Sequence, residues 1–394
     1  MNFKVKTHNA IADTGISRLD NGNYSISAKE ISPDAIILRS YKMSEEDLCE
    51  SLKAIARAGA GYNNVPVAKC SELGIVVFNT PGANANAVKE IVLAGLLLSS
   101  RGIFAGANFI NGIEGITADN LKSHVESGKK EFKGRELKDG TLGVVGMGAI
   151  GAQVANMGVM LEMNVMGYDP AITVEAAWKL PNKVTRTDDL KSIFANSDYV
   201  TLHVPAIEAT KNLVNKELLS SCKPGLKLIN FARDEIVDSS AIIEALTSGQ
   251  LGSYVTDFAD LNLIERANSH GDVIIFPHIG ASTKQAEENC SVMAADQLKD
   301  FLENGNIKNS VNFPELLEER KSEFRLTVSN KNVAGMIGQI TTVLAENNLN
   351  IIEMTNKSRG DIAYNVIDLH SEASEKVISE LSSLDNVIKV RGIS

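Results

Sequence analysis

The stretch Thr141-Leu-Gly-Val-Val-Gly-Met-Gly-Ala-Ile-Gly151, followed by Val165-Met-Gly-Tyr-Asp169, decides the fold of this chain. An apolar run enters a Gly-x-Gly-x-x-Gly turn, a helical segment follows, and a second apolar run ends in a carboxylate. Gly146 permits the tight turn, and Gly148 lets a pyrophosphate approach the backbone at the positive end of the helix. Gly151 lets helix and strand pack closely. The pattern predicts a dinucleotide-binding α/β unit.

The carboxylate of Asp169 indicates which dinucleotide is bound. It lies roughly 20 residues after the turn, where a carboxylate accepts hydrogen bonds from an adenosine ribose. It would repel a 2′-phosphate, and the following Pro170-Ala171-Ile172 offers no cation to attract one. We therefore expect NAD as the cofactor rather than NADP.

Composition limits the class of protein. The chain has 394 residues, 44% of them hydrophobic, which suffices for two or three domains. Its net charge of -10 disfavours binding to nucleic acid or anionic membranes, and the apolar run at 91–98 is too short to span a bilayer. The four scattered cysteines indicate reduced thiols in a cytoplasmic protein, and no cluster suggests a metal site.

Apolar runs alternate with helical stretches up to about residue 312, which predicts parallel sheets of the α/β class. In open parallel sheets, ligands bind outside the carboxyl ends of the strands. Six residues at or just after the ends of predicted strands are therefore expected to converge on one crevice: Gly146, Asp169, His203, Arg233, Asp257 and His278.

The last part of the chain has a different pattern. Residues 309–322 are predicted to form a hinge. Beyond it, strands and helices are expected in the order β-α-β-β-α-β, at 324–328, 334–347, 350–357, 363–369, 373–384 and 387–390. That order is typical of a ferredoxin-like domain.

The strand-end residues suit hydride transfer from a secondary alcohol to a nicotinamide. His278 is the expected base, because an imidazole exchanges protons near neutral pH. Arg233 is the expected clamp for the substrate carboxylate, because its planar guanidinium binds a carboxylate in bidentate fashion. Asp257 could accept a hydrogen bond from the nicotinamide carboxamide.

Three segments carry a resemblance to a known family: residues 230–238, Asp198-Tyr-Val-Thr-Leu-His-Val-Pro205, and Pro277-His-Ile-Gly-Ala-Ser-Thr283. They resemble the signatures of the D-2-hydroxyacid dehydrogenases. Arg39-Ser40, residues 57–65 and Asn79-Thr-Pro-Gly82 resemble the substrate-domain motifs of that family. The C-terminal part resembles an ACT domain, a regulatory fold that often binds amino acids between subunits.

The resemblance implies two Rossmann-like, doubly wound parallel-sheet domains and a C-terminal ferredoxin-like ACT domain. The substrate-binding domain would comprise residues 1–97 and 282–314, the NAD-binding domain 98–281, and the ACT domain 322–394. The implied reaction is NAD-dependent oxidation of 3-phospho-D-glycerate to 3-phosphohydroxypyruvate, the first step of L-serine biosynthesis. A homodimer or homotetramer is expected.

The expected ligand contacts fall into three groups. Those for the cofactor are Gly146, Gly148, Ala149, Ile150, Gly151, Asp169, His203, Val204, Pro205, Ala232 and Asp257. Those for the substrate are Arg39, Arg57, Ala58 and Gly59. The amides Asn332 and Asn350 match positions at which the family binds an L-serine effector.

The chain departs from the family pattern in three places. Asp234 follows Arg233 where the family has glycine, and the histidine of the effector site is absent. Asn262 stands where the family has the glutamate that orients the catalytic histidine, so Asp260 or Asn262 must serve His278, and Asp260 is favoured. Two other functions stay open: a glycerate, glyoxylate or lactate dehydrogenase of the same family, and an NAD-sensing regulator on the same scaffold.

Overall fold

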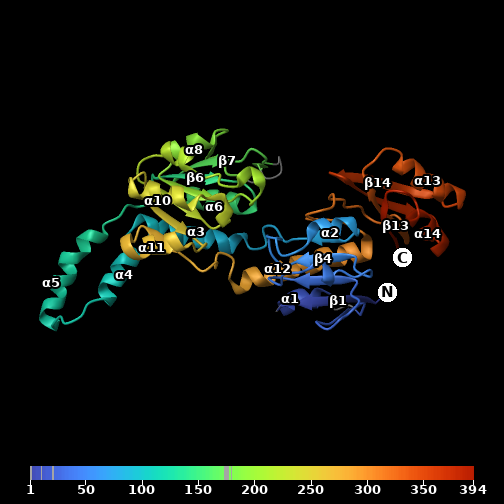
Figure 1. Ribbon diagram of the computed structural model, residues 1–394, viewed down its shortest axis with the longest axis horizontal. Helices are drawn as coiled ribbons and strands as arrows, with labels where there is room; N and C mark the ends of the chain where they lie inside the picture. Colours follow the sequence, from blue (N-terminus) through green and yellow to red (C-terminus); the bar gives the residue numbers. More distant parts are fainter. Residues whose placement is uncertain (1, 10, 20–21, 173–176, 179) are drawn as a thin grey trace. The chain divides into compact units, whose positions relative to one another are not determined.

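The computed structural model describes residues 2–9, 11–19, 22–172, 177–178 and 180–394 (Figure 1). The chain forms two compact units. The first unit comprises Met1–Asn84 and Lys284–Ser394, and the second unit comprises Ala85–Thr283. The predicted fold class is confirmed, since each unit contains a parallel sheet and the C-terminal sheet is antiparallel.

The first unit is built on a five-stranded parallel sheet in the order β2-β1-β3-β4-β5. Its strands are apolar because helices and loops cover both faces, and every residue of β3 is buried. The long helix α12, Lys284–Asn304, packs Ala294, Leu298 and Phe301 into the core beneath this sheet. The other elements are β1 Phe3–His8, α1 Asp13–Ile16, η1 Ser17–Leu19, β2 Tyr24–Ile26, β3 Ala35–Leu38, η2 Glu45–Asp47, β4 Ala54–Arg57, α2 Val67–Glu72 and β5 Val76–Phe78.

The first unit also contains the C-terminal domain, whose elements follow the predicted β-α-β-β-α-β order. They are β13 Phe324–Lys331, α13 Met336–Glu346, β14 Ile351–Arg359, β15 Ile362–Leu369, α14 Glu375–Ser382 and β16 Val387–Ile393. The sheet order is β14-β15-β13-β16. Tyr364 and Val366 of this sheet share one hydrophobic core with Phe301 and Phe313. The C-terminal domain is therefore packed onto the rest of the unit rather than joined to it by an open hinge.

The second unit is built on a seven-stranded parallel sheet in the order β12-β11-β10-β9-β6-β7-β8. The order reverses between β6 and β9, which creates a crevice at the carboxyl edge. Its strands are β6 Thr141–Val145, β7 Asn164–Tyr168, β8 Val184–Arg186, β9 Tyr199–Leu202, β10 Leu226–Asn230, β11 Leu251–Thr256 and β12 Val273–Ile275. Its helices are α3 Ala85–Ser100, α4 Ile103–Asn111, α5 Ala118–Gly128, η3 Lys129–Phe132, α6 Ala149–Met160, α8 Leu190–Asn196, η4 Glu208–Thr210, α9 Lys216–Ser220, η5 Asp234–Ile236, α10 Ser239–Thr247 and α11 Leu261–His270.

Helix α3 belongs wholly to the second unit. The domain boundary expected from the sequence, after residue 97, would have divided this helix. The physical reason is packing: Val88, Val92 and Leu96 of α3 lie in the same core as Val144 and Val154 of the dinucleotide-binding turn. No single helix among the described residues is long and apolar enough to cross a bilayer, and α3 with α4 passes such a test only as a pair bent by 70°.

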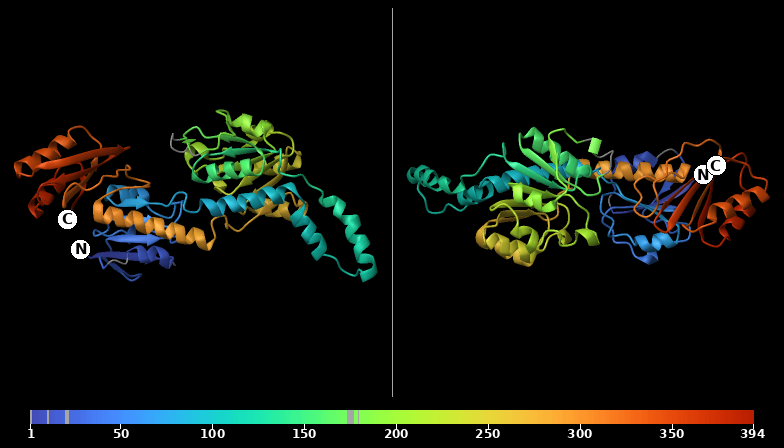
Figure 2. Two further views of the ribbon diagram at one scale, coloured as in Figure 1. Left: turned by 180° about the vertical axis from the view of Figure 1, so that it is seen from behind. Right: turned by 90° about the horizontal axis from the view of Figure 1, so that it is seen from above.

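Helices α4 and α5 form an arm that extends away from the sheet of the second unit (Figures 1 and 2). Neither helix has a buried residue. The arm nevertheless carries large apolar side chains, among them Phe104, which is 58% exposed, and Ile110, which is 48% exposed. Such a surface is unusual for an element that stays in water.

Candidate functional site

The glycine-rich turn after β6 has the backbone that the sequence predicted. Gly146 has a φ of 93°, and a Cβ there would lie 2.5 Å from the carbonyl oxygen of His203. A Cβ on Gly151 would lie 1.8 Å from the carbonyl oxygen of Gly146, so the helix could not approach the turn with a larger residue. Gly148 is the N-cap of α6, provides no side-chain cap, and has open space beside it. Gly148 and Ala149 are exposed and Ile150 is half-buried, so uncapped N–H groups at this helix end can receive an anion.

Asp169 lies beside this turn at the end of β7. Its Oδ2 accepts a hydrogen bond from the Met147 N–H at 2.8 Å, and its Oδ1 accepts one from the Ala171 N–H at 2.9 Å. The half-buried carboxylate is thus fixed next to the open helix end, and each oxygen keeps a lone pair for a ligand hydroxyl.

His203 follows β9 on the other side of the turn. Its N–H donates to the carbonyl of Val145 at 2.7 Å, and its Nε2 lies 3.0 Å from Thr201 Oγ1. Burial lowers the pKa of His203 to about 3, because desolvation disfavours the charged imidazolium. His203 is therefore neutral at physiological pH. Val204 is half-buried and Pro205 is exposed at the same edge.

Asn230 braces the turn that presents Arg233. The fully buried Asn230 side chain accepts from the Ala232 N–H at 3.0 Å and donates to the Arg233 carbonyl at 2.8 Å. The half-buried Arg233 guanidinium donates to the Ala232 carbonyl at 2.6 Å. Within the described residues it forms no ion pair with Asp234, so the guanidinium keeps donors for a carboxylate.

Asp257 and His278 are joined through the backbone. The buried Asp257 carboxylate accepts from the Ile279 N–H at 2.8 Å and from the Gly280 N–H at 2.6 Å, and the Asp257 carbonyl accepts from the His278 N–H at 3.1 Å. His278 has a φ of 56°, in the left-handed region. Its exposed ring meets the edge of Phe258, with 5.2 Å between ring centroids. Three consecutive amides bound to one aspartate thus hold the histidine turn.

Neither residue proposed to orient His278 bonds to its ring in the part of the chain that the structure describes. Asp260 caps α11, where its Oδ1 accepts from the Asn262 N–H at 2.9 Å and the Leu263 N–H at 3.2 Å. Asn262 lines a hollow of about 390 Å³ between α10 and α11, together with Ser240, Ile243, Glu265, Arg266 and Ser269. The orienting role of either residue stays a prediction.

The six predicted strand-end residues of this unit occupy one edge because every strand of the sheet is parallel. From β12 to β7 the edge carries, in spatial order, His278, Asp257, Arg233, His203, Gly146 and Asp169. Neighbouring strands lie about 4.8 Å apart, so six adjacent strands extend over about 24 Å. An edge of this length suits an extended ligand with the reacting group at one end and an adenosine-type ribose at the other.

The predicted substrate residues lie at the carboxyl edge of the sheet in the first unit. Arg39 follows β3 and pairs with Glu287 of α12, with Nη1 and Oε1 2.6 Å apart. Arg57 ends β4, and its Nε donates to the Arg39 carbonyl at 3.2 Å. A Cβ on Gly59 would lie 1.5 Å from Arg57 Nη1, so a side chain at residue 59 would displace this guanidinium. Ala58, which is buried, ties the two strands by donating to the Leu38 carbonyl.

The structure does not bring Asn332 and Asn350 together. Asn332 follows β13 and donates to the Gly360 carbonyl at 3.1 Å, next to the end of β14. Asn350 precedes the start of β14. The nine residues of β14 span about 30 Å, so within one chain the two exposed amides cannot contact one small molecule.

Sequence reasoning missed Asn230 as a brace, Phe258 as a neighbour of the histidine ring and Glu287 as the partner of Arg39. Asn230 ends a strand and could have been noticed for that reason. Glu287 carried no signal, because it lies far along the chain from Arg39. In the described part of the chain, no group of three or more His, Cys, Asp or Glu residues could hold a metal ion.

Known proteins share this arrangement. Residues 109–280 match the family described as D-isomer specific 2-hydroxyacid dehydrogenase, NAD binding domain. The chain is 31% identical over 366 residues to D-3-phosphoglycerate dehydrogenase of Haemophilus influenzae, across 90% of this chain and 85% of that one. It is 35% identical over 315 residues to the enzyme of that name from Synechocystis sp., across 78% of this chain and 54% of that one.

The chain covers only 62% of the D-3-phosphoglycerate dehydrogenase of Methanocaldococcus jannaschii, at 31% identity, so some relatives are considerably longer. Among solved structures, the NAD+-bound 3-phosphoglycerate dehydrogenase of Entamoeba histolytica matches with a TM-score of 0.63 at 29% identity. The match covers 80% of this chain and 100% of that one.

Proposed function

The chain belongs to the D-isomer specific 2-hydroxyacid dehydrogenases, and we propose that it oxidises 3-phosphoglycerate to 3-phosphohydroxypyruvate with NAD, the first step of L-serine biosynthesis. The observation that carries the proposal is the order of groups along one sheet edge. An anion-binding helix end and a ribose-binding carboxylate lie at one end of that edge, and a guanidinium and an imidazole lie toward the other.

The residues around the glycine-rich turn fit NAD. The uncapped N–H groups at Gly148, Ala149 and Ile150 would bind the pyrophosphate, and Asp169 would accept from the ribose hydroxyls. The nicotinamide half would contact His203, Val204, Pro205, Ala232 and Asp257. When bound, the nicotinamide accepts the hydride.

The chemical step falls to Arg233 and His278. Arg233 would bind the substrate carboxylate and fix the direction of the C–H bond, because two parallel N–H donors hold a carboxylate in one orientation. His278 would take the proton of the substrate hydroxyl as hydride leaves. Its ring is exposed, and no hydrogen bond to it is seen among the described residues, so it is available to a substrate.

Arg39 and Arg57 are proposed to bind the anionic groups of the substrate, with Ala58 and Gly59 supplying backbone contacts. 3-Phosphoglycerate carries both a carboxylate and a phosphate, and a protein with a net charge of -10 needs local cations to bind it. The two adjacent arginines supply them. They favour this substrate over glycerate, glyoxylate or lactate, which carry no phosphate.

One variant distinguishes a dehydrogenase from a purely regulatory NAD-binding protein. The absence of a carboxylate hydrogen bond to the His278 ring, within the described residues, is the observation that favours the regulatory alternative. His278→Asn should keep the turn, because asparagine tolerates a positive φ. An enzyme should then still bind NAD but lose NADH formation. NADH formation at the wild-type rate would remove His278 from the mechanism.

The orienting partner of His278 can be assigned from pH profiles of kcat/KM. We favour Asp260, whose Oδ2 is not used in capping α11. Asp260→Asn should lower the rate and shift the limb assigned to His278 to lower pH, since a carboxylate favours the charged imidazolium. If that profile does not move while Asn262→Glu shifts the limb upward, residue 262 is the orienting position.

We also propose a regulatory role for the C-terminal domain. We infer that this domain is an ACT domain with L-serine as its effector, held by Asn332 and Asn350. Asn332 and Asn350 lie at opposite ends of β14. One serine could therefore contact an Asn332 and an Asn350 only at an interface between two copies whose β14 strands run antiparallel to each other. L-serine should therefore slow the enzyme, and Asn332→Ala should abolish the response. An enzyme indifferent to millimolar serine would contradict this part.

Self-association is proposed through the α4–α5 arm. Its exposed Ile103, Phe104, Ile110 and Leu121 would be covered by a second copy, giving a homodimer or a homotetramer. Phe104→Lys with Ile110→Lys should yield monomers by light scattering. We also propose a cytoplasmic location, which suits the four unpaired cysteines.

A further inference from the structure

The carboxyl end of α12 is capped by side chains from the C-terminal domain and the segment before it. The last carbonyls of a helix have no backbone partner within the helix, and they form the negative end of its dipole. Here four consecutive carbonyl oxygens each accept a hydrogen bond from a different side chain. The pairs are Leu302 with Arg391 at 3.1 Å, Glu303 with Arg320 at 3.4 Å, Asn304 with Arg325 at 2.9 Å, and Gly305 with Tyr364 at 2.8 Å.

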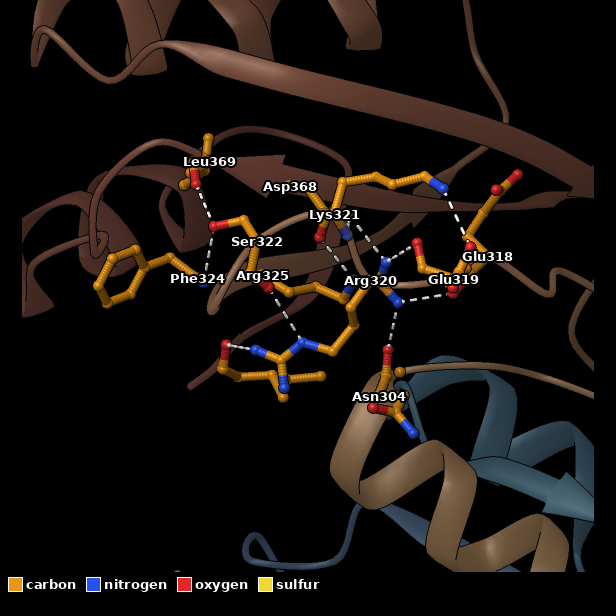
Figure 3. Close-up of polar contacts among 12 residues, drawn as sticks. Asn304, Glu318, Glu319, Arg320, Lys321, Ser322, Phe324, Arg325, Asp368 and Leu369 are labelled. Carbon is orange, nitrogen blue, oxygen red and sulfur yellow. Dashed lines mark hydrogen bonds and ion pairs between the residues drawn. The ribbon is translucent and has the colours of Figure 1, made fainter.

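Arg325 is the centre of this cap (Figure 3). Its guanidinium is buried and pairs with Asp368, with Nε 2.7 Å from Oδ1 and Nη2 2.9 Å from Oδ2. Its Nη1 donates to the carbonyls of Asn304 and Glu318 at 2.9 and 3.0 Å. A buried guanidinium is stable only where acceptors surround it, so this network has one favourable geometry. The end of α12 is therefore fixed against β13.

Aromatic rings also contribute to the cap at the end of α12. The Arg391 guanidinium lies 4.6 Å from the centre of the Phe301 ring, close enough for a cation–π interaction. Tyr364 is buried and meets Phe313 edge to face, with 6.1 Å between centroids. The last turn of α12 is thus held by charge, hydrogen bonds and apolar contact together.

The other end of α12 holds a residue of the proposed substrate site. Glu287, in its first turn, pairs with Arg39 at 2.6 Å. A helix of 21 residues is about 32 Å long and moves as a rod, because its backbone hydrogen bonds lie within the helix. Restraint at Arg325 and Arg391 therefore limits where Glu287 can place Arg39.

We propose that Arg325, Arg391 and Tyr364 are positioning residues for substrate binding, acting through α12 and Glu287 on Arg39. The C-terminal domain is then a fixed component of the substrate-binding unit as well as a place for an effector. The inference rests on the proposed role of Arg39 as a substrate ligand. It predicts that loosening the far end of α12 weakens binding of the substrate and leaves binding of NAD unchanged.

The test compares full-length variants. Arg391→Met removes one cap and the cation, and Tyr364→Phe removes only a hydroxyl, so the milder variant remains informative if the first fails to fold. Lys389→Met is the matched control, because its amine donates to the Leu52 carbonyl at 2.6 Å, and among the described residues no hydrogen bond from it to α12 is found. Two readouts are needed: amide hydrogen exchange along residues 284–305, and KM for 3-phosphoglycerate and for NAD.

Arg391→Met and Tyr364→Phe should speed exchange both at residues 301–305 and near Glu287, and Glu287→Gln should reproduce the change in KM. Networks of this kind transmit 0.5–2 kcal/mol, so KM for 3-phosphoglycerate should rise by roughly 2- to 30-fold. KM for NAD should not change. Unaltered exchange near Glu287, or an equal effect of Lys389→Met, overturns the inference. A wild type that does not oxidise 3-phosphoglycerate contradicts the proposed function instead, and the exchange data still decide whether the cap restrains α12.

Discussion

Asp257→Asn tests how the turn at His278, Ile279 and Gly280, which we propose to be catalytic, is held. The aspartate accepts from the Ile279 and Gly280 N–H groups at 2.8 and 2.6 Å, and its own carbonyl accepts from the His278 N–H. Asparagine has nearly the same shape but only one side-chain acceptor, so its NH2 group must face one of the two amides. His278 then loses part of the support for its left-handed φ of 56°, a conformation that costs a residue other than glycine about 1–2 kcal/mol.

The size of the effect follows from the lost bond. A hydrogen bond to a charged group contributes about 1.5–3 kcal/mol. If this about 1.5–3 kcal/mol is lost from the ordering of the turn, kcat should fall by about 13- to 160-fold. The matched control is Asp189→Asn, since Asp189 also accepts from two successive amides with its two oxygens, those of Lys191 and Ser192 at the start of α8.

The assay is steady-state NADH formation, combined with calorimetric binding of NAD and of ADP-ribose to the same variant. Loss of kcat with unchanged binding of both ligands supports a role in holding His278. Weakened NAD binding with unchanged ADP-ribose binding would assign Asp257 to the nicotinamide carboxamide instead. Unaltered kcat and binding would refute both roles.

Three further predictions follow from the same geometry. Arg233→Ala should lower kcat/KM by two to four orders of magnitude, since a charge-assisted bidentate contact is worth about 3–5 kcal/mol and each 1.36 kcal/mol is tenfold. Near-normal turnover would show that Arg233 does not bind the substrate carboxylate. Asp169→Ala should raise KM for NAD and reduce the preference of the enzyme for NAD over NADP. A wild type that uses NAD and NADP equally well would show that Asp169 does not select the cofactor. Burial opposes ionisation of Asp368, but hydrogen bonds from Arg325 and the Lys321 N–H outweigh it and lower its pKa, so its stabilising effect is present above about pH 3.9 and is lost as pH falls toward the lower folded pKa. Asp368→Asn should therefore cost about 3–5 kcal/mol in the free energy of unfolding at neutral pH, and the cost should shrink as pH falls through the lowered folded pKa, measured by urea titration.

The residues at the carboxyl edge of the second sheet could be predicted from the sequence, because their placement depends only on the direction of the strands. Strands that alternate with helices are parallel, so polar residues such as His203 and Asp257 at the ends of apolar runs must meet at one edge. The glycine positions were predictable for a similar reason, since Gly146 and Gly151 face backbone atoms that any such turn presents.

What the sequence could not predict depends on tertiary contact. The side-chain donors that cap α12 come from three strands and a connecting segment, and Arg320, Arg325 and Arg391 have no common spacing. The segment around Arg320 is polar and resembles a hinge, yet the Arg320 guanidinium donates to the Glu303 carbonyl at the helix end. Asn332 and Asn350 were grouped by family resemblance, whereas the direction of β14 separates them.

We propose above that this chain oxidises 3-phosphoglycerate with NAD, using Arg233 and His278. The most direct measurement is NADH absorbance after mixing the protein and NAD with 3-phosphoglycerate, D-glycerate, D-lactate or glycolate at alkaline pH. We expect NADH formation with 3-phosphoglycerate and at least tenfold lower kcat/KM for the other acids, because losing the phosphate removes charge-assisted contacts worth at least about 1.4 kcal/mol. Binding of NAD without NADH formation from any of these acids would contradict it.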